Sequence, residues 1–396
     1  MLEPVIQALV DQLDASFQPA PGQRLVERRH LEITGLFGAM HILRNYYVQG
    51  QKGVCPADQS LGLEGAYTPA LSRMMLRAAA KNSYLEASAD LFEYAGVRVC
   101  DRQIQRLVLR VAPQVRPWLD TLQESEPVPL MYLSADGTGV PMRKEELEGR
   151  QGKQADGSAK TREVKLGCVF LQTQIDAEGH PVRKEASTTY VGSFEVAAEF
   201  GLLLRQEARR RGLAKAGKVV FLGDGAAWVW ELARVNFPGA ILILDFYHAL
   251  QHVHGLVEAL WGKDTPEGRK ARKGWTTWLL KDKAKQIVSQ ATERLPMALD
   301  TERAQSEIGY LKNNLARMSY GTCRKAGCFI GSGVVEAGCK TVVGKRMKCS
   351  GMFWSEEGGQ GILDLRCAFL SNQLDAFCHS RASTYLPRQL PLKLAA

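Results

Sequence analysis

Apolar residues recur with two different periods along this chain of 396 residues, and the change of period divides it into regions. Residues 25–60 alternate apolar and polar positions around a glycine-containing turn, which predicts a β-hairpin. Residues 68–122 carry apolar side chains at three- and four-residue steps, which predicts helices. Gly96 is a typical glycine stop for one helix, and Cys100 or Asp101 caps the next. Two helices joined by a short turn predict a helix-turn-helix.

Beyond a break at residues 124–129, short apolar runs alternate with helical segments. The runs have the length and composition of buried strands. In chain order we expect three strands, a helix, a strand, a helix and a strand, over residues 129–136, 161–175, 181–192, 193–212, 218–224, 226–237 and 239–245. This order is that of the α/β ribonuclease H-like fold, a mixed five-stranded sheet flanked by helices.

After His248 the pattern stays helical to about Met318, which predicts an all-helical insertion. A helix carrying Glu336 then begins at residue 332 or 333, and a last helix begins near residue 357. We therefore divide the chain into an N-terminal helix and β-hairpin unit (1–66), a helical, helix-turn-helix-like domain (67–125), the first part of an α/β core (126–249), an all-helical insertion (250–330), the glutamate helix and final helix of the core (331–380) and a tail (381–396).

Two of the predicted buried strands run directly into an aspartate. Asp136 ends the first strand and Asp224 the fourth, at the carboxyl edge of the sheet, where ligands of open α/β sheets collect. These strands are neighbours in a ribonuclease H-like sheet, so we expect the two carboxylates side by side. Hard divalent cations take oxygen ligands of this kind. Ordinary turn chemistry is the alternative, because a glycine follows each aspartate.

Three further side chains are candidates for the same site. Glu336 lies in the first turn of its helix and is the third candidate ligand, with an ion pair to Lys340 as the alternative. Asp245 and His248 follow the last buried strand, and His248 is either a structural histidine or a phosphate contact or general acid. We expect Mg²⁺, with Mn²⁺ as a substitute, to be held by Asp136 together with the second aspartate and the glutamate, for phosphoryl transfer on a nucleic acid.

Charge and composition narrow the class of protein. The chain has 51 Lys and Arg against 42 Asp and Glu, a net charge of +9, which suits an anionic polymer without being specific to one. No run of 18 apolar residues and no signal peptide is present, so we expect a cytoplasmic protein without a membrane partner. The nine cysteines form no CxxC pair, so we expect reduced thiols and no zinc.

Basic residues gather in two segments. The helix predicted from residue 101 has a polar stripe opposite an apolar face, as in a recognition helix, and a solvated face of a core helix is the alternative. Its DNA-binding candidates are Arg102, Gln103, Arg106 and Arg110. The second segment lies around and after the glutamate helix, where basic side chains are expected to hold phosphates. Its candidates are Lys340, Lys345, Arg346 and Lys348.

Four segments resemble those of bacterial insertion-sequence transposases of the DDE class, in the Kra-type group, which is distantly similar to Mutator-type transposases. The segments are DGTGVPM (136–142), FLGDGAAWVW (221–230), ILDFYHALQH (243–252) and SGVVEAGCKTVVGKRMKCSGMFWSEEGGQGILDLR (332–366). The resemblance implies that the catalytic carboxylates are Asp136, Asp224 and Glu336. It also implies that Asp245 and His248 form the secondary signature of Mutator-like enzymes, with His248 near the chemistry.

The resemblance implies a DNA transposase that binds insertion-sequence ends and catalyses metal-dependent cleavage and strand transfer in DNA recombination. It also implies an insertion that lies beside DNA, and we expect the predicted N-terminal β-hairpin and helix-turn-helix region to bind DNA. The expected partners are terminal repeats, target DNA and further copies of the chain, in a homodimer or larger synaptic complex associated with the bacterial nucleoid. The alternatives are a ribonuclease H-like DNA nuclease or resolvase without strand transfer, and a catalytically silent transposase-derived DNA-binding protein.

Overall fold

The computed structural model describes residues 2–152 and 159–385, which form two compact units. The first unit contains the chain up to Leu119 and the chain from Glu357 onward. The second unit contains Asp120–Glu356. None of the described helices is long and apolar enough to span a bilayer.

The N-terminal part of the first unit is the predicted β-hairpin with a helix on either side in sequence. Its elements are α1 (Glu3–Ser16), β1 (Arg24–Gly35), β2 (Gly38–Gln49), β3 (Lys52–Val54) and α2 (Pro56–Ser60). The strands pair antiparallel in the order β1-β2-β3. Ile33 and Ile42 lie on one face of the hairpin and are buried with Val10 of α1, so this small sheet is held by an apolar core of its own.

Four helices follow in the same unit: α3 (Pro69–Lys81), α4 (Tyr84–Ala95), α5 (Asp101–Val111) and α6 (Val115–Asp120). Ser83 and Glu86 form a capping box at the start of α4, and Gly96 ends this helix with a φ of 66°. The apolar face of α5 is buried, as its periodicity predicts, with Ile104 and Val108 both 0% exposed. Helix α5 packs on α3 and α4, so its polar face is turned outward.

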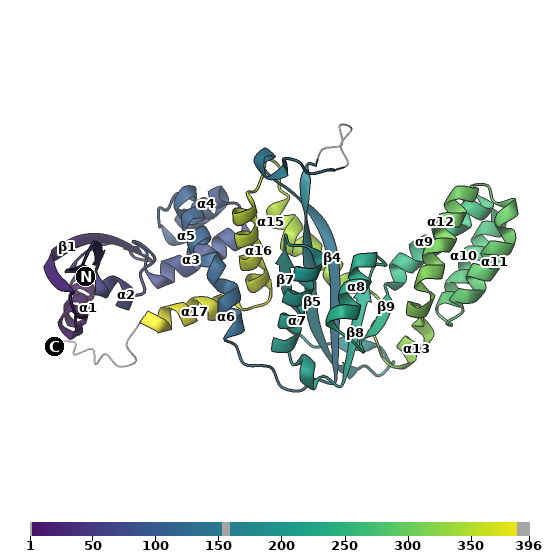
Figure 1. Ribbon diagram of the computed structural model, residues 1–396, viewed down its shortest axis with the longest axis horizontal. Helices are drawn as coiled ribbons and strands as arrows, with labels where there is room; N and C mark the ends of the chain where they lie inside the picture. The colour runs from purple at the N-terminus through teal and green to yellow at the C-terminus, as the bar shows by residue number, and fades with distance from the viewer. Residues whose placement is uncertain (1, 153–158, 386–396) are drawn as a thin grey trace. The chain divides into compact units, whose positions relative to one another are not determined.

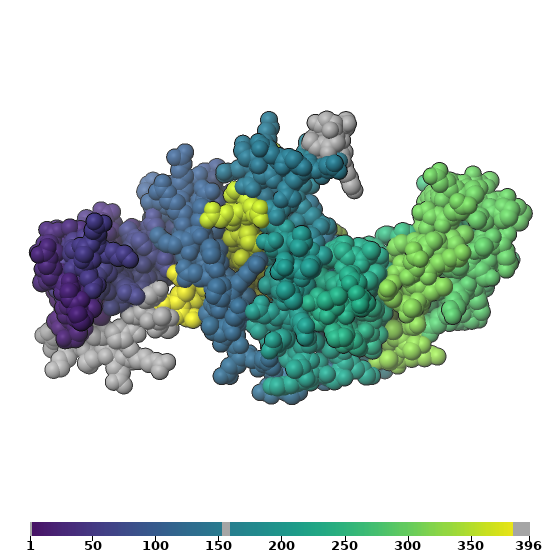
Figure 2. Space-filling view, in the orientation of Figure 1, coloured from purple at the N-terminus to yellow at the C-terminus, as the bar shows by residue number. Residues whose placement is uncertain are grey.

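The two C-terminal helices, α16 (Glu356–Leu370) and α17 (Leu374–Tyr385), belong to the first unit and not to the core, where we expected residues 331–380. The reason is a set of contacts with the N-terminal helices. Arg366 donates to the carbonyl of Ala80 at 2.8 Å, and Asp364 pairs with Arg116 at 2.9 Å. Figure 2 shows these yellow C-terminal helices against the blue N-terminal ones. The expected division of the chain therefore needs correction at residue 356.

A mixed sheet forms the centre of the second unit, which confirms the predicted α/β architecture. Its strands are β4 (Leu130–Pro141), β5 (Thr161–Ile175), β6 (Pro181–Arg183), β7 (Thr189–Ser193), β8 (Lys218–Gly223) and β9 (Ile241–Leu244). The order is β6-β5-β4-β8-β9, and β7 also pairs with β5. β4 and β5 are antiparallel, whereas β8 is parallel to both β4 and β9. Six strands thus occupy the five predicted positions.

The strand expected over residues 181–192 is in fact divided into β6 and β7, both along the same edge of β5. The backbone leaves the sheet between them, where Ala186 has a φ of 50°. Ser187 secures the excursion, because its hydroxyl donates to the carbonyl of Lys184 at 2.7 Å and accepts from the amide of Leu171 at 3.1 Å. A left-handed residue cannot continue a strand, so the division follows.

Helices cover both faces of this sheet. Helices α7 (Ala197–Arg210) and α8 (Ala227–Asn236) lie side by side against it (Figure 1). Helix α14 (Gly333–Gly338) contacts β4 and β5, and the π-helical turn over Cys339–Gly344 contacts β4 and leads into α15 (Lys345–Met347). Gly338 permits this approach, since a Cβ there would come within 2.7 Å of the Tyr190 ring. With both faces covered, Leu133 of β4 and Phe221 of β8 are 0% exposed.

The region predicted as an all-helical insertion contains α9 (Phe246–Trp261), α10 (Pro266–Leu279), α11 (Ala284–Arg294), α12 (Thr301–Asn314) and α13 (Tyr320–Lys325). Helices α9, α10, α11 and α12 pack together as a bundle (Figure 1). The insertion begins directly after β9, four residues earlier than expected. Its two ends meet, because the amide of Phe246 donates to the carbonyl of Ile330 at 2.9 Å.

Candidate metal centre

Asp136 lies on β4, and Asp224 directly follows the neighbouring parallel strand β8. Each paired residue of β4 lies opposite the residue 88 positions later in β8, from Leu130 and Lys218 to Ser134 and Leu222. The same spacing separates the two aspartates, two residues beyond the last pair. The register therefore places them together at the carboxyl end of β8. We expected the first strand to end at Asp136, but β4 continues to Pro141. Beyond Asp136 it pairs with β5 alone.

Backbone groups orient both carboxylates. The amide of Gly137 donates to Oδ1 of Asp136 at 2.7 Å, and the amide of Ala226 donates to Oδ1 of Asp224 at 3.0 Å. Gly225 follows Asp224 with a φ of 102°, a conformation that favours glycine. Asp224 thus sits in a tight turn, and the turn presents a half-buried carboxylate at the sheet edge. Turn chemistry and a ligand role are compatible at this position.

Glu336 lies in the first turn of α14, half-buried and near the two aspartates. The hydroxyl of Ser332 donates to Oε1 of Glu336 at 3.2 Å. Lys340, one turn later, is exposed, and in the described part of the chain it forms no ion pair with Glu336. The alternative explanation of Glu336 as half of a helix ion pair therefore lacks support.

The charges of two neighbouring carboxylates act on Asp136. Burial raises the pKa of Asp136, and the negative charges of Asp224 and Glu336 raise it further, while hydrogen bonds from the Cys339 thiol and the Gly137 amide act in the opposite direction. Burial also raises the pKa of Cys339, so this residue remains a thiol and a donor. Half-buried oxygen donors whose charges repel are a suitable set for a hard divalent cation.

Asp245 is 0% exposed and connects three elements around this site. As the N-cap of α9 it accepts from the amide of His248 at 2.8 Å, and its other oxygen accepts from the amide of Ser332, just before α14. Its own amide donates to the carbonyl of Gly223, the last residue of β8, at 2.7 Å. Asp245 thus fastens the end of β8, the start of α9 and the segment carrying Glu336.

Glu336 lies close to Asp245 and His248 in this structure. One potential ligand atom from each of the three residues lies within 4.8 Å of the other two. Nδ1 of His248 is buried and has no hydrogen-bond partner among the described residues. A polar atom in that condition is available to a ligand. The structure therefore brings Asp245, His248 and Glu336 into one cluster, and the charge of Glu336 also acts on Asp136.

The basic residues predicted beside Glu336 differ in exposure. Lys340, Lys345 and Lys348 are exposed, and Nζ of Lys348 donates to the hydroxyl of Thr138, two residues beyond Asp136. Arg346 is only 1% exposed, which contradicts our expectation of a phosphate contact. A buried guanidinium has no access to a DNA backbone, so Arg346 is removed from the DNA-binding candidates.

Arg346 has a structural environment instead. Its guanidinium carbon lies 5.1 Å from the centre of the Trp354 ring, and Nη1 contacts the sulfur of Met352 at 3.6 Å. Trp354 in turn donates to the carbonyl of Met347 at 3.0 Å and bonds the end of β4 through Pro141. These contacts anchor the segment after Glu336 to the extension of β4.

The candidate DNA-binding residues of α5 all lie on its exposed face. Arg102 and Arg106 are exposed and lie one turn apart. Gln103 accepts from the amide of Cys100 at 2.9 Å, so its carbonyl oxygen caps the helix. Arg110 pairs with Glu64 at 3.1 Å. The helix therefore presents Arg102 and Arg106 more freely than the other two candidates.

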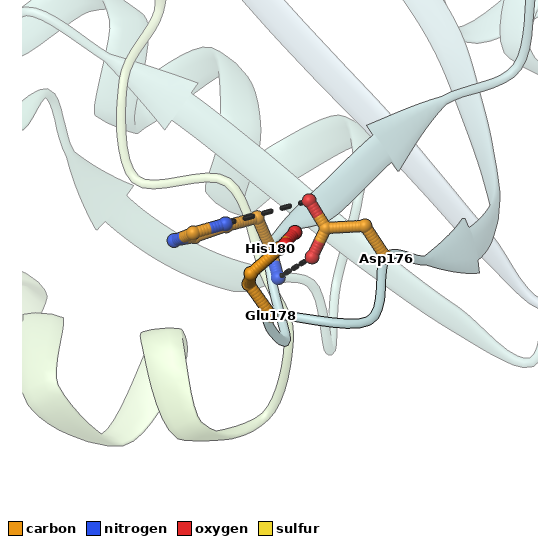
Figure 3. Close-up of side chains that lie close together, drawn as sticks. All are labelled: Asp176, Glu178 and His180. Atoms are coloured by element: carbon orange, nitrogen blue, oxygen red, sulfur yellow. Dashed lines mark hydrogen bonds and ion pairs between the residues drawn. The ribbon is translucent and has the colours of Figure 1, made fainter.

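A second group of potential metal-ligating side chains lies in the turn between β5 and β6. Figure 3 shows Asp176 facing the ring and backbone of His180, with Glu178 beside them. All three residues are exposed. The amide of His180 donates to Asp176 at 2.7 Å, and this bond lowers the pKa of the carboxyl. The geometry is that of a polar turn, so these residues need no ion to explain their position.

Sequence reasoning missed three side chains that contact the site. Ser332 bonds to Glu336, and Cys339 bonds to Asp136. Tyr310 of α12 donates its hydroxyl to the backbone carbonyl of Asp224 at 2.7 Å. Burial raises the pKa of Tyr310, and the charge of Asp224 raises it further. No periodicity or motif connects Tyr310 with a residue 86 positions earlier.

No family model matches the chain, and no curated protein matches it. Among solved structures the chain is similar to the one titled "Drosophila P element transposase strand transfer complex", with a TM-score of 0.30 and 11% sequence identity. That similarity covers 80% of this chain and 81% of the other. A likeness at so low a TM-score supports no conclusion about function.

Proposed function

We propose that this protein is a DNA transposase of the DDE class, with a ribonuclease H-like core and the carboxylates of Asp136, Asp224 and Glu336 as its metal ligands. One observation carries the proposal: the register of β4 and β8 sets two aspartates at the same level, and Glu336 lies near enough for its charge to act on Asp136. The strand order β6-β5-β4-β8-β9, with β7 also on β5, supports the ribonuclease H-like core of this proposal.

The residues of the chain bind and orient divalent cations, Mg²⁺ or in its place Mn²⁺. When bound, such ions activate an attacking water or 3′-hydroxyl and stabilise the leaving oxygen of a phosphodiester. Gly137 and Ala226 hold the aspartates through their amides, which reduces the reorganisation needed on binding. Asp245 supports Glu336 through the amide of Ser332. Reaction at a phosphodiester therefore requires no nucleophilic side chain.

His248 acts on the nucleic acid in this proposal. Its buried Nδ1 without a partner lies in the same cluster as Glu336, so the ring is positioned for a phosphate contact or for proton transfer to a leaving oxygen. A purely structural histidine would be expected to satisfy both ring nitrogens within the protein.

Two exposed basic groups serve as DNA contacts in the proposal. Lys340, Lys345 and Lys348 are exposed around and after the glutamate helix, and in the proposal their charges offset the repulsion between the carboxylates and phosphates. Arg102 and Arg106 of α5 read the ends of the element. Pairing of two ends in one complex would require at least two copies of the chain.

The test is incubation of the full-length protein with labelled DNA that contains the ends flanking its gene, in Mg²⁺ or Mn²⁺. We expect nicks or breaks at the ends and products joined to target DNA. Cleavage without joined products would favour a nuclease or resolvase of the same fold. Binding without cleavage in either metal would favour a catalytically silent DNA-binding protein and refute the enzymatic proposal.

A further inference from the structure

A tyrosine of the helical insertion holds the turn that carries Asp224. Tyr310 lies on α12, and its hydroxyl donates to the main-chain carbonyl of Asp224 at 2.7 Å. The side chain of Asp224 has a separate support, the amide of Ala226 at 3.0 Å. Two separate hydrogen bonds therefore hold Asp224, one at its backbone carbonyl and one at its carboxylate.

The Tyr310 ring is itself held in place within the insertion. It stacks on the ring of His252 in α9, with centroids 3.5 Å apart and planes inclined by 18°. Nδ1 of His252 lies 2.6 Å from a carboxylate oxygen of Glu307, one turn before Tyr310 on α12. The hydroxyl therefore has a defined position, set by two helices of the bundle.

The turn at Asp224 is shaped to receive this hydroxyl. A Cβ at residue 225 would lie 2.3 Å from the hydroxyl oxygen of Tyr310, so only glycine leaves space for it. The φ of 102° at Gly225 also favours glycine. Two independent features of residue 225, its conformation and its lack of a side chain, thus match the approach of Tyr310.

We propose that Tyr310 is a positioning residue for the metal centre: its hydroxyl fixes the Asp224–Gly225 turn and thereby couples the helical insertion to the affinity of Asp224 for a divalent cation. The inference rests on the proposed function, since it takes Asp224 as a ligand. Groups that orient a ligand without touching the ion typically contribute about 10- to 100-fold to metal affinity or activity.

The expected effect is on metal affinity more than on the fold or on DNA binding. Without the hydroxyl, the carbonyl of Asp224 loses its partner and the peptide plane after Asp224 is free to turn. The stacking of the ring on His252 is retained in phenylalanine. We therefore expect Tyr310→Phe to fold normally and to bind Mn²⁺ about tenfold more weakly.

The experiment measures Mn²⁺ binding to the full-length protein by electron paramagnetic resonance of the free ion, for the wild type, Asp224→Asn, Tyr310→Phe and Tyr320→Phe. Tyr320 is the matched control, because it lies in the same insertion and its buried hydroxyl has no hydrogen-bond partner among the described residues. Thermal unfolding is recorded for each variant. Cleavage of end-containing DNA is then measured against Mn²⁺ concentration.

The inference predicts weaker Mn²⁺ binding and a higher half-saturating Mn²⁺ concentration for Tyr310→Phe, with the Michaelis constant for DNA unchanged and Tyr320→Phe like the wild type. Equal Mn²⁺ binding by Tyr310→Phe and the wild type, with binding lost in Asp224→Asn, overturns the inference and leaves the proposed function standing. Wild-type protein that binds no Mn²⁺ overturns both.

Discussion

Ser332 donates its backbone N–H to the carboxylate of Asp245, 87 residues earlier in the chain. The helical insertion lies between the two residues in sequence, so the bond joins the end of β9 to the segment that carries Glu336. Sequence separation between the second aspartate and the glutamate is therefore no obstacle to a shared site. A local contact at the base of the insertion brings the segment after β9 and the segment before α14 together.

The carboxylates give the first prediction. Asp136→Asn, Asp224→Asn and Glu336→Gln each remove a charged oxygen donor, and we expect each to reduce DNA cleavage at least 1,000-fold, on the order of the losses seen for groups essential to catalysis. DNA binding should persist in a gel-shift assay, since the basic surfaces are untouched. Near-normal cleavage by any one variant would exclude that residue as a ligand. Glu178→Gln, in the exposed turn of Figure 3, is the control and should cut normally.

The polar face of α5 gives the second prediction. Arg106→Ala removes an exposed cation without disturbing the buried face of the helix. We expect the preference for end DNA over random DNA to fall by about 1–3 kcal/mol, the range for a base contact. Competition binding with end DNA and with random DNA measures this preference. Arg209→Ala, an exposed arginine on α7, is the control. Unchanged preference in Arg106→Ala would remove α5 as the recognition helix.

The contrast between two neighbouring residues gives the third prediction. Arg346 is buried against Trp354 and should matter for stability, whereas Lys345 is exposed and should matter for DNA affinity. We expect Arg346→Ala to lower the free energy of unfolding by about 2–4 kcal/mol, as for other buried side chains in a network. Lys345→Ala should leave unfolding unchanged and make DNA binding less sensitive to salt. The opposite pattern in denaturation and salt titration would restore Arg346 as a DNA contact.

Asp364 gives the fourth prediction, on pH. Burial raises its pKa from 3.8 to about 6, although Arg116 and Gln360 act in the opposite direction. The folded state thus holds a proton that the unfolded chain releases at lower pH, and this carboxyl makes stability fall as the pH rises from about 4 to about 6. Asp364→Asn should lack this contribution. Urea denaturation of the wild type and of Asp364→Asn at pH 4.5 and pH 7 measures this contribution. An equal pH dependence of stability in the two proteins would contradict the raised pKa of Asp364.

The sheet could be predicted because its strands are buried on both faces and so are continuous apolar runs, as at residues 218–223. The break between β6 and β7 could not, because it depends on a left-handed conformation at Ala186 that alanine rarely adopts. The sequence predicts that the last helix belongs to the core, together with the helix that carries Glu336. The true partners of the last helix, Ala80 and Arg116, lie more than 240 residues away.

In the candidate site, too, some residues could be predicted from the sequence and others could not. The placement of Asp136 and Asp224 at neighbouring strands could be predicted because strand ends and strand order are both visible as sequence patterns. Arg346 was misjudged because a run of basic residues normally lies on the surface, and only the fold supplies the ring of Trp354 above it. Tyr310 could not be found, because its contact is with the backbone of Asp224 and leaves no requirement on neighbouring residue types except Gly225.

The meeting of the two ends of the helical insertion has a consequence for how the protein tolerates change. Phe246 bonds Ile330, and Asp245 bonds Ser332, so the two ends of the helical insertion form a neck, in which the chain leaves β9 and returns to α14 side by side. Helices far from this neck are free to lengthen or shorten over evolutionary time without moving the strands. The stretch of α12 around Tyr310 lacks that freedom, because it reaches back to the sheet.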